Sequence, residues 1–226
     1  MHTIESAYRN MNDFFNSRAR RLLLSGAVTA LVAAATASPA LAGNKFPAGA
    51  PASTAALDSM STADCTMPAL TEPFSAYNDT NEYALVPGQA FDSFAGTGWT
   101  LSGGATIQTA TLADKATGSV LDLRSGAEAI SPPMCVQSDY TNAHTIIFDV
   151  SRSQAVKLDA QYAGTSSPVS AGRFWGSGAP WTASNPVNTN PGSQSGWQLV
   201  VFTLQGSREA GDEQVYNFYV DPRMIS

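Results

Sequence analysis

Histidine and cysteine, the residue types that most often perform catalysis or hold metal ions, are scarce in this sequence of 226 residues. It contains only His2, His144, Cys65 and Cys135. A serine nucleophile needs a neighbouring base, and His144 alternates in phase with Ile146, which favours a core or sheet-edge histidine over a member of a catalytic triad. One histidine and two cysteines in the body of the chain cannot supply the ligands of a zinc site.

Carboxylates and amides leave two other kinds of chemistry to consider. Calcium takes about six to eight oxygen ligands, and weak candidates stand near the start and the end of the main domain: Asp79, Asn81, Glu82 and Asp221. Their spacing matches no defined calcium loop, so a solvated loop is the favoured interpretation, and calcium is the one cofactor left open. Glycoside hydrolysis needs two carboxylates across a cleft, for which Asp149 and Asp159 are the best pair, although plain solubility is the favoured explanation of both.

Aromatic rings with amides nearby indicate sugar binding in one long segment. Residues 164–196 are rich in Gly, Ser, Pro and Asn, and a loop of this length in a compact domain is usually functional or disordered. Sugar rings stack on aromatic faces while neighbouring polar groups bind their hydroxyls. The candidate ligand-binding residues are Trp175, Trp181, Arg173 and Asn188, with Asn185 and Asn190 beside them. The alternative is that either tryptophan folds back to cap the domain.

The first 42 residues have the layout of a secretory signal. Arginines end in the pair Arg20-Arg21, the next 20 residues carry no charge, and small residues at Ala40 and Ala42 fit a signal-peptidase site. We therefore expect cleavage after Ala42, secretion or a cell-envelope location, and no membrane span in the mature chain. A retained membrane helix is the alternative, and the arginine pair leaves both the general secretory and the twin-arginine routes open.

Composition narrows the choice of partner. Charged residues make up 13% of the chain, against about 25% in a typical soluble domain, and the sequence pI is near 4.7. Removing the leader takes away four of the 12 basic residues and two of the 18 acidic residues, which leaves a formal charge of −8. This charge excludes a phosphate-reading nucleic-acid binder. A surface whose polarity comes from Ser, Thr, Asn and Gly suits hydroxyl-rich partners.

Short runs of period two predict a β-sheet domain after the leader. Residues 43–64 are a Pro/Ala/Ser/Thr stretch without periodicity and are expected to be a flexible linker. From residue 65 to 226, Gly, Pro, Asn and Ser interrupt the runs about every 8 to 12 residues, which is typical of one antiparallel β-sandwich or barrel. The expected strands are 144–150 and 156–162, joined as a hairpin, then 197–204 and 215–220, and more weakly 83–86, 98–102, 105–112, 119–123 and 128–135. Trp99 and Trp197 lie within strands and are expected in the core.

The two cysteines both follow the leader. Because an exported protein meets oxidising conditions, we expect a Cys65–Cys135 disulfide that closes a loop of about 70 residues and contributes about 4 kcal/mol to stability. Two buried free thiols are the alternative.

Several segments resemble an uncharacterised family of exported bacterial proteins with a galactose-binding-like, jelly-roll β-sandwich domain. The segments are 83–88 (YALVPG) followed by Phe91, 98–105 (GWTLSGGA), 127–136 (AEAISPPMCV), the Trp181 segment and 219–222 (YVDP). The resemblance spans roughly residues 65–222 and implies a jelly-roll fold and the Cys65–Cys135 pairing. Similar sandwiches bind sugars. Tyr216-Asn217 stand where the family tends to place an acidic pair, which argues against an acid-dependent metal or ligand role there.

Together these observations favour an exported, non-catalytic binding or adhesion module for carbohydrate or cell-envelope material. One alternative is a structural envelope protein without a small-molecule site, favoured if both Trp175 and Trp181 are buried. The other is a hydrolase that uses two carboxylates on the sandwich face.

Overall fold

The domain is built from two antiparallel β-sheets. A computed structural model describes residues 57, 59–148, 155–177, 180–191, 195–207 and 213–221. The predicted signal peptide and most of the predicted linker lie outside these residues. Among the described residues, no helix is long and apolar enough to cross a membrane.

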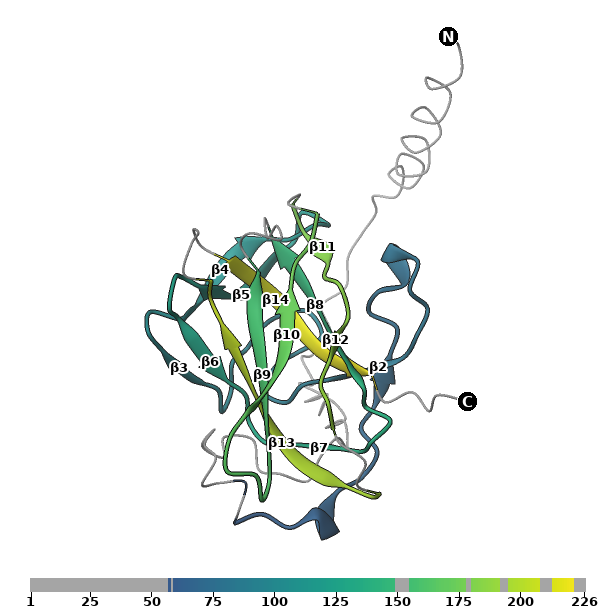
Figure 1. The fold of residues 1–226 in the computed structure, drawn as a ribbon. Coiled ribbons are helices and arrows are strands. Elements are labelled where there is room, and N and C mark those ends of the chain that lie inside the picture. The colour runs from purple at the N-terminus through teal and green to yellow at the C-terminus, as the bar shows by residue number, and fades with distance from the viewer. Residues whose placement is uncertain are drawn as a thin grey trace, which may run out of the picture. The chain divides into compact units, whose positions relative to one another are not determined.

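Eight strands form one sheet and six form the other (Figure 1). The eight-stranded sheet contains β1 (Leu70–Thr71), β2 (Tyr83–Leu85), β4 (Thr106–Thr111), β5 (Thr117–Leu123), β8 (Asn142–Phe148), β11 (Thr182–Ala183), β12 (Val187–Asn188) and β14 (Glu213–Asp221). The six-stranded sheet contains β3 (Thr100–Ser102), β6 (Glu128–Ile130), β7 (Met134–Val136), β9 (Val156–Tyr162), β10 (Val169–Phe174) and β13 (Gln198–Gln205). Two short 3-10 turns, η1 (Thr62–Asp64) and η2 (Ser75–Tyr77), complete the described elements. The predicted all-β antiparallel sandwich is confirmed.

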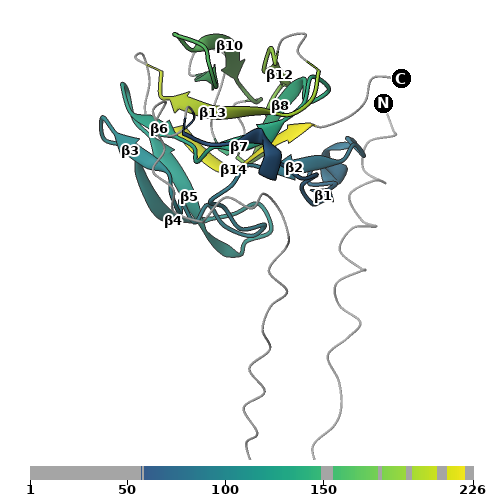
Figure 2. The ribbon, with the colours of Figure 1, turned by 90° about the horizontal axis from the view of Figure 1, so that it is seen from below.

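The core lies between the two sheets, which Figures 1 and 2 show as two layers with β13 on one side and β14 on the other. Alternate residues of β13 face inward because side chains of a strand point to opposite faces. Phe202 of β13 packs edge to face on Phe218 of β14, with ring centroids 5.3 Å apart. Trp99 is buried, and its indole nitrogen donates to the Pro87 carbonyl (2.9 Å), so its predicted place in the core is confirmed. Trp197 is only partly buried and packs at the margin of the core.

β13 is a central strand of the six-stranded sheet, and its outward Leu199 and Val201 are buried because Leu57 and Met60 pack on them. It pairs with β9 on one side and with β6 and β7 on the other. The predicted single strand 128–135 is divided into β6 and β7 because Pro132 and Pro133 carry no backbone N–H for the ladder.

The predicted hairpin between strands 144–150 and 156–162 is wrong. Both strands form, but β8 pairs with β14, β11 and β12, whereas β9 pairs with β10 and β13 in the other sheet. A period-two pattern shows that one face of a strand is buried, but it does not say which sheet contains the strand. The irregular segment predicted at 164–196 also contains three strands, β10, β11 and β12, which are too short or too rich in glycine to give a clear pattern.

The predicted disulfide between Cys65 and Cys135 is present, and the chain has no free cysteine. It fixes the segment before β1 to the outer face of the six-stranded sheet. Leu57 and Met60, at the end of the predicted linker, pack there with Cys135, Leu199 and Val201. We call the described residues 57 and 59–65 the N-terminal strap. The last residues of the predicted linker therefore belong to the folded domain.

Candidate functional site

The outer face of the six-stranded sheet is divided into an apolar half and a polar half. On β13 the outward residues are Leu199, Val201, Thr203 and Gln205, because the intervening Val200, Phe202 and Leu204 belong to the core. The N-terminal strap covers Leu199 and Val201. The half that the strap leaves uncovered carries polar side chains.

Four polar residues stand in register across this uncovered half. Arg173 of β10 pairs with Lys157 of β9, Lys157 pairs with Gln205 of β13, and Gln205 pairs with Glu128 of β6. We call these residues the polar row. Strand pairing thus places a hydrogen-bonding group on each of four neighbouring strands.

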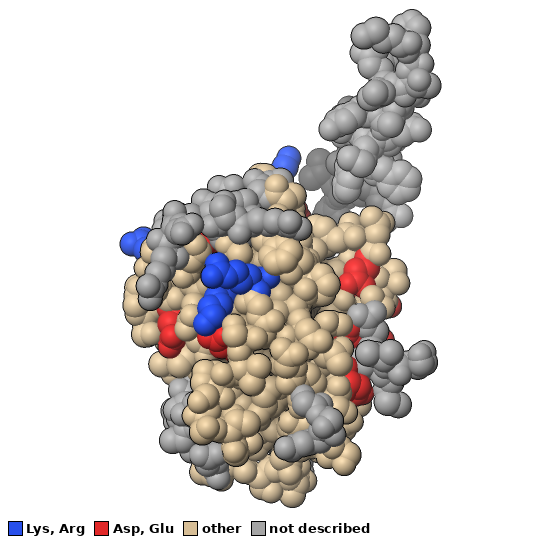
Figure 3. Space-filling view, in the orientation of Figure 1, with Lys and Arg blue, Asp and Glu red and all other residues tan. Residues whose placement is uncertain are grey.

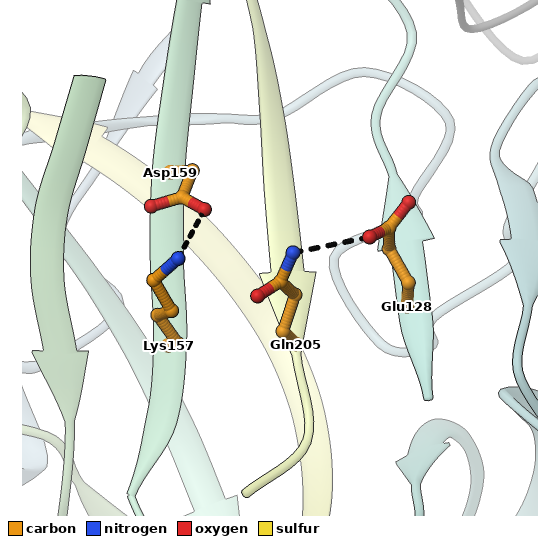
Figure 4. Close-up of polar contacts among 4 residues, drawn as sticks. All are labelled: Glu128, Lys157, Asp159 and Gln205. Carbon is orange, nitrogen blue, oxygen red and sulfur yellow. Dashed lines mark hydrogen bonds and ion pairs between the residues drawn. The ribbon is translucent and has the colours of Figure 1, made fainter. Parts of the chain in front are cut away.

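Two contacts hold the polar row in place (Figure 4). The Lys157 ammonium lies 2.6 Å from Oδ2 of Asp159, two residues further along β9 and on the same face. The Gln205 amide donates to Oε2 of Glu128 (3.0 Å). Asp159 is only 7% exposed, and its second oxygen, Oδ1, is buried without a hydrogen-bond partner in the described part of the chain. The sheet face therefore presents both donors and acceptors.

Arg173 is the most exposed charge of the polar row. Its side chain forms no ion pair with any residue in the described ranges, whereas Lys157 is bound to Asp159. Figure 3 shows a cluster of Lys and Arg side chains on this face with acidic side chains next to it, while other cationic side chains stand apart at the upper edges of the view.

Trp175 follows β10 directly and is held by Asn185. The backbone N–H of Trp175 donates to Oδ1 of Asn185 (2.8 Å), and the Asn185 amide donates to the carbonyl of Arg173 (3.1 Å). The Asn185 N–H also donates to the Trp175 carbonyl (3.0 Å). Asn185 thereby fixes the backbone on which both Arg173 and Trp175 are placed. Trp175 is half-buried.

Asn188 lies on β12, next to β10. A Cβ atom built on Gly172 of β10 would lie only 3.0 Å from Val187, which shows how closely the two strands approach. Asn188 is exposed, and its Oδ1 accepts a hydrogen bond from the Asn190 N–H (2.7 Å). The structure thus brings Arg173, Trp175, Asn185 and Asn188 to the same margin of the sandwich.

Trp181 lies elsewhere, on the eight-stranded sheet. Its ring packs on Phe148 of β8 and Tyr216 of β14, with centroids 5.1 and 6.1 Å apart, and its indole nitrogen donates to the Thr111 carbonyl (2.8 Å). Only 5% of the residue is exposed. Trp181 therefore caps its own sheet and leaves little surface on which a sugar ring could stack.

The acidic residues considered for calcium make contacts within the protein. The Asp79 carboxylate accepts hydrogen bonds from the Asn81 N–H (3.0 Å), the Asn81 amide and the Tyr83 hydroxyl. Burial opposes ionisation of Asp79, but these hydrogen bonds outweigh it and lower its pKa. Asp221 is buried in β14, which pairs with β2. Within the described ranges, no group of three or more His, Cys, Asp or Glu side chains is placed to share a metal ion.

His144 and Asp159, the described residues that were considered for catalysis, both make contacts within the protein. His144 is buried with its ring 4.9 Å from that of Phe74 and 5.5 Å from that of Tyr83, which confirms the interpretation as a packed sheet histidine. Asp159 is bound to Lys157, and Asp149, its partner in the hydrolase alternative, lies outside the described residues.

A carboxylate with a shifted pKa lies at the end of the core near Arg173. Glu213, at the start of β14, is 2% exposed and accepts hydrogen bonds from the Ser207 N–H at both oxygens (2.9 and 3.2 Å). Burial raises its pKa to about 7, although the Ser207 N–H and the charge of Arg173 act in the opposite direction.

The sequence pattern predicts the strand 156–162, which contains Lys157 and Asp159, but it does not predict the polar row. Gln205 lay just outside the predicted strand 197–204, and Glu128 belonged to a strand predicted only weakly. The register between strands, which brings these residues together, has no local signal in a single sequence.

The chain is similar in structure to several carbohydrate-binding modules. A family 6 module from Clostridium stercorarium in complex with cellobiose is 15% identical, with a TM-score of 0.38, over 55% of this chain and 87% of that one. A β-1,3-glucan-binding family 6 module from Bacillus halodurans is 16% identical, with a TM-score of 0.32, over 55% and 95%. A module of a Cellvibrio mixtus lichenase in complex with cellotriose is 15% identical, with a TM-score of 0.31, over 54% and 89%. Neither a protein-family model nor a curated protein sequence matches the chain.

Proposed function

We propose that this protein is an exported, non-catalytic module that binds carbohydrate or another cell-envelope polymer. Its binding surface is the uncovered half of the six-stranded sheet together with Trp175. The observation that carries the proposal is the polar row, which ends on Arg173 beside the half-buried Trp175.

The spacing of the polar row suits an extended polymer. Neighbouring strands lie about 4.8 Å apart, so the three steps from β10 to β6 cover about 14 Å. Along this line a ligand meets a guanidinium, an ammonium, an amide and a carboxylate in turn. A chain with many hydroxyl groups both donates and accepts hydrogen bonds, and this surface offers partners for both.

Trp175 supplies the apolar part of the site. The face of an indole packs on the C–H face of a sugar ring, while amide and charged groups hold the hydroxyls at the edge. Asn185 fixes the Trp175 backbone, so little conformational entropy of that segment is lost on binding. Asn188 adds an exposed amide at the same margin. We assign ring stacking to Trp175 and assign Trp181 to the packing of the other sheet.

Affinity electrophoresis in gels that contain soluble polysaccharides tests this proposal. Trp175→Ala is expected to abolish the retardation that the wild-type protein shows. Phe91→Ala is the matched control, because Phe91 is 44% exposed and its carbonyl accepts hydrogen bonds from Asn217 and Tyr216 of β14 in the other sheet. Equal retardation of wild type and Trp175→Ala, or loss of binding in Phe91→Ala alone, would exclude the proposed surface.

The alternative of a structural envelope protein is favoured if both tryptophans of the segment are buried. Trp181 meets this condition and Trp175 does not. Absence of retardation by every polysaccharide tested, with a folded protein, would favour that alternative.

A further inference from the structure

We propose that the ligand of the polar row is an acidic polysaccharide, and that Arg173 with Lys157 binds the carboxylate of a uronic acid residue. This inference rests on the proposed function and names the chemical class of its ligand. It also departs from the sequence composition, which by itself favours uncharged partners.

The position of the two cations on the sheet favours an anionic ligand. Arg173 and Lys157 are directly opposite each other on neighbouring strands, where like charges destabilise a sheet. The described part of the chain contains only four cationic side chains, Lys115, Arg124, Lys157 and Arg173, in a protein of net charge −6. Half of them therefore stand in register on one uncovered face, and a bound anion gives that arrangement a function.

The acidic side chains near Arg173 leave it able to bind an anion. Asp159 is bound to Lys157 at 2.6 Å, so this pair is close to neutral and leaves Arg173 as the cation that an anion can approach. Glu213 lies near Arg173 but is buried, and because its pKa is raised to about 7 it is only partly ionised at neutral pH. The carboxylates around Arg173 in the described part of the chain therefore do not fully neutralise it.

Glu128, the acidic member of the polar row, lies far from the ligand carboxylate that Arg173 binds. Glu128 is three strands away from β10, about 14 Å, and its carboxylate accepts a hydrogen bond from Gln205. At physiological ionic strength the Debye length is about 8 Å, so Glu128 repels a ligand charge at β10 only weakly. The acidic end of the row faces another part of the polymer.

The chemistry of arginine favours a carboxylate. A guanidinium donates two parallel N–H bonds to the two oxygens of a planar carboxylate, and Lys157, whose ammonium has three N–H donors, adds a hydrogen bond from the next strand besides the one to Asp159. Trp175 is two residues from Arg173, so a ring stacked on the indole belongs to the same or the neighbouring sugar unit. A sulfate ester carries the same charge on a tetrahedral group. The experiment distinguishes a sulfate ester from a uronic acid carboxylate.

The experiment compares polygalacturonate with its fully methyl-esterified form by isothermal titration calorimetry. The backbone is the same and only the carboxylate charge differs. The wild-type protein is expected to bind the acid at least about tenfold more tightly than the ester, with a preference that falls as salt is added. Arg173→Gln is expected to remove this preference and to keep the weaker, Trp175-dependent binding of the ester. Lys115→Gln, which removes an exposed cation from the turn between β4 and β5 of the other sheet, is the control and keeps the preference.

The possible outcomes separate the two proposals. Equal affinity for acid and ester, or an unchanged preference in Arg173→Gln, overturns the acidic ligand but leaves a neutral-sugar module standing if binding still depends on Trp175. Tighter binding of dextran sulfate than of polygalacturonate overturns the uronic acid in favour of a sulfate ester. Absence of binding to any polysaccharide overturns both proposals.

Discussion

Asn185 is the residue on which the geometry of the candidate site depends most. Its side chain bonds to the backbone of both Arg173 and Trp175. We predict that Asn185→Ala lowers the free energy of unfolding by about 1–3 kcal/mol, because a backbone donor and acceptor lose their partner, and also weakens polysaccharide binding. Urea unfolding and calorimetry measure the two effects. Asn188→Ala, at an exposed position, is expected to change stability by less than about 0.5 kcal/mol; an equal loss in both variants would argue against the role of Asn185.

Glu213 gives stability a definite pH dependence. Because the pKa of Glu213 is raised from 4.5 to about 7 in the folded state, the folded protein binds more protons than the unfolded chain between these pH values. The contribution of this group to the free energy of unfolding therefore falls as pH rises through this window. We predict that Glu213→Gln has a smaller decrease in stability between pH 5 and pH 8 than wild type. Parallel pH profiles of the two proteins in urea unfolding would contradict this assignment.

Some residues could be placed from the sequence and others could not. Trp99 and His144 alternate with apolar neighbours, and a pair of cysteines in an exported chain has few other uses, so these three predictions were confirmed. Trp175 and Trp181 have the same composition around them, yet one lies beside β10 and the other packs on β8 and β14. Only the pairing of strands distant in sequence distinguishes the two.

At the scale of elements, the N-terminal strap shows how one covalent bond positions a segment. The Cys65–Cys135 bond closes a loop with a sequence separation of 70, and the strap covers Leu199 and Val201. We predict that replacing both cysteines by serine lowers the free energy of unfolding by about 4 kcal/mol and exposes this apolar surface. Urea unfolding and binding of a hydrophobic dye measure the two changes. If stability falls but dye binding stays at the wild-type level, the strap holds its place without the disulfide.

The assignment of Trp181 to the eight-stranded sheet can be tested separately. Trp181→Phe keeps most of the ring contact with Phe148 and Tyr216 and removes the bond to the Thr111 carbonyl. We predict a loss of about 1 kcal/mol in stability and unchanged polysaccharide affinity. A fall in affinity as large as that of Trp175→Ala would show that Trp181 belongs to the binding site.

The strands were easier to predict than their partners. Period-two patterns found β8, β9, β13 and β14, because each buries one face or both. The hairpin between β8 and β9 failed because adjacency in sequence does not determine pairing in a sandwich, where a connection can cross from one sheet to the other. The division of β6 from β7 at Pro132-Pro133 follows from local chemistry and could have been predicted.

At the scale of the whole molecule, the two outer faces of the sandwich have different roles. The described side chains on the eight-stranded sheet include a packed aromatic group of Phe74, Tyr83, His144 and Tyr219, with Trp181 nearby. The six-stranded sheet has the strap on one half and the polar row on the other. The charge composition of the sequence does not predict this difference between the two faces, because the two cations of the polar row come into register only after folding.

Nuclear magnetic resonance of the ¹⁵N-labelled protein, titrated with polygalacturonate oligomers, tests the location of the site most directly. Backbone amide signals of β6, β9, β10 and β13 around the polar row, and the indole N–H signal of Trp175, are expected to shift in proportion to the bound fraction. The indole signal of Trp181 and the amides of the N-terminal strap are expected to stay in place. Shifts that gather around Trp181 and Tyr216 on the eight-stranded sheet, with the polar row unchanged, would contradict the proposed binding face.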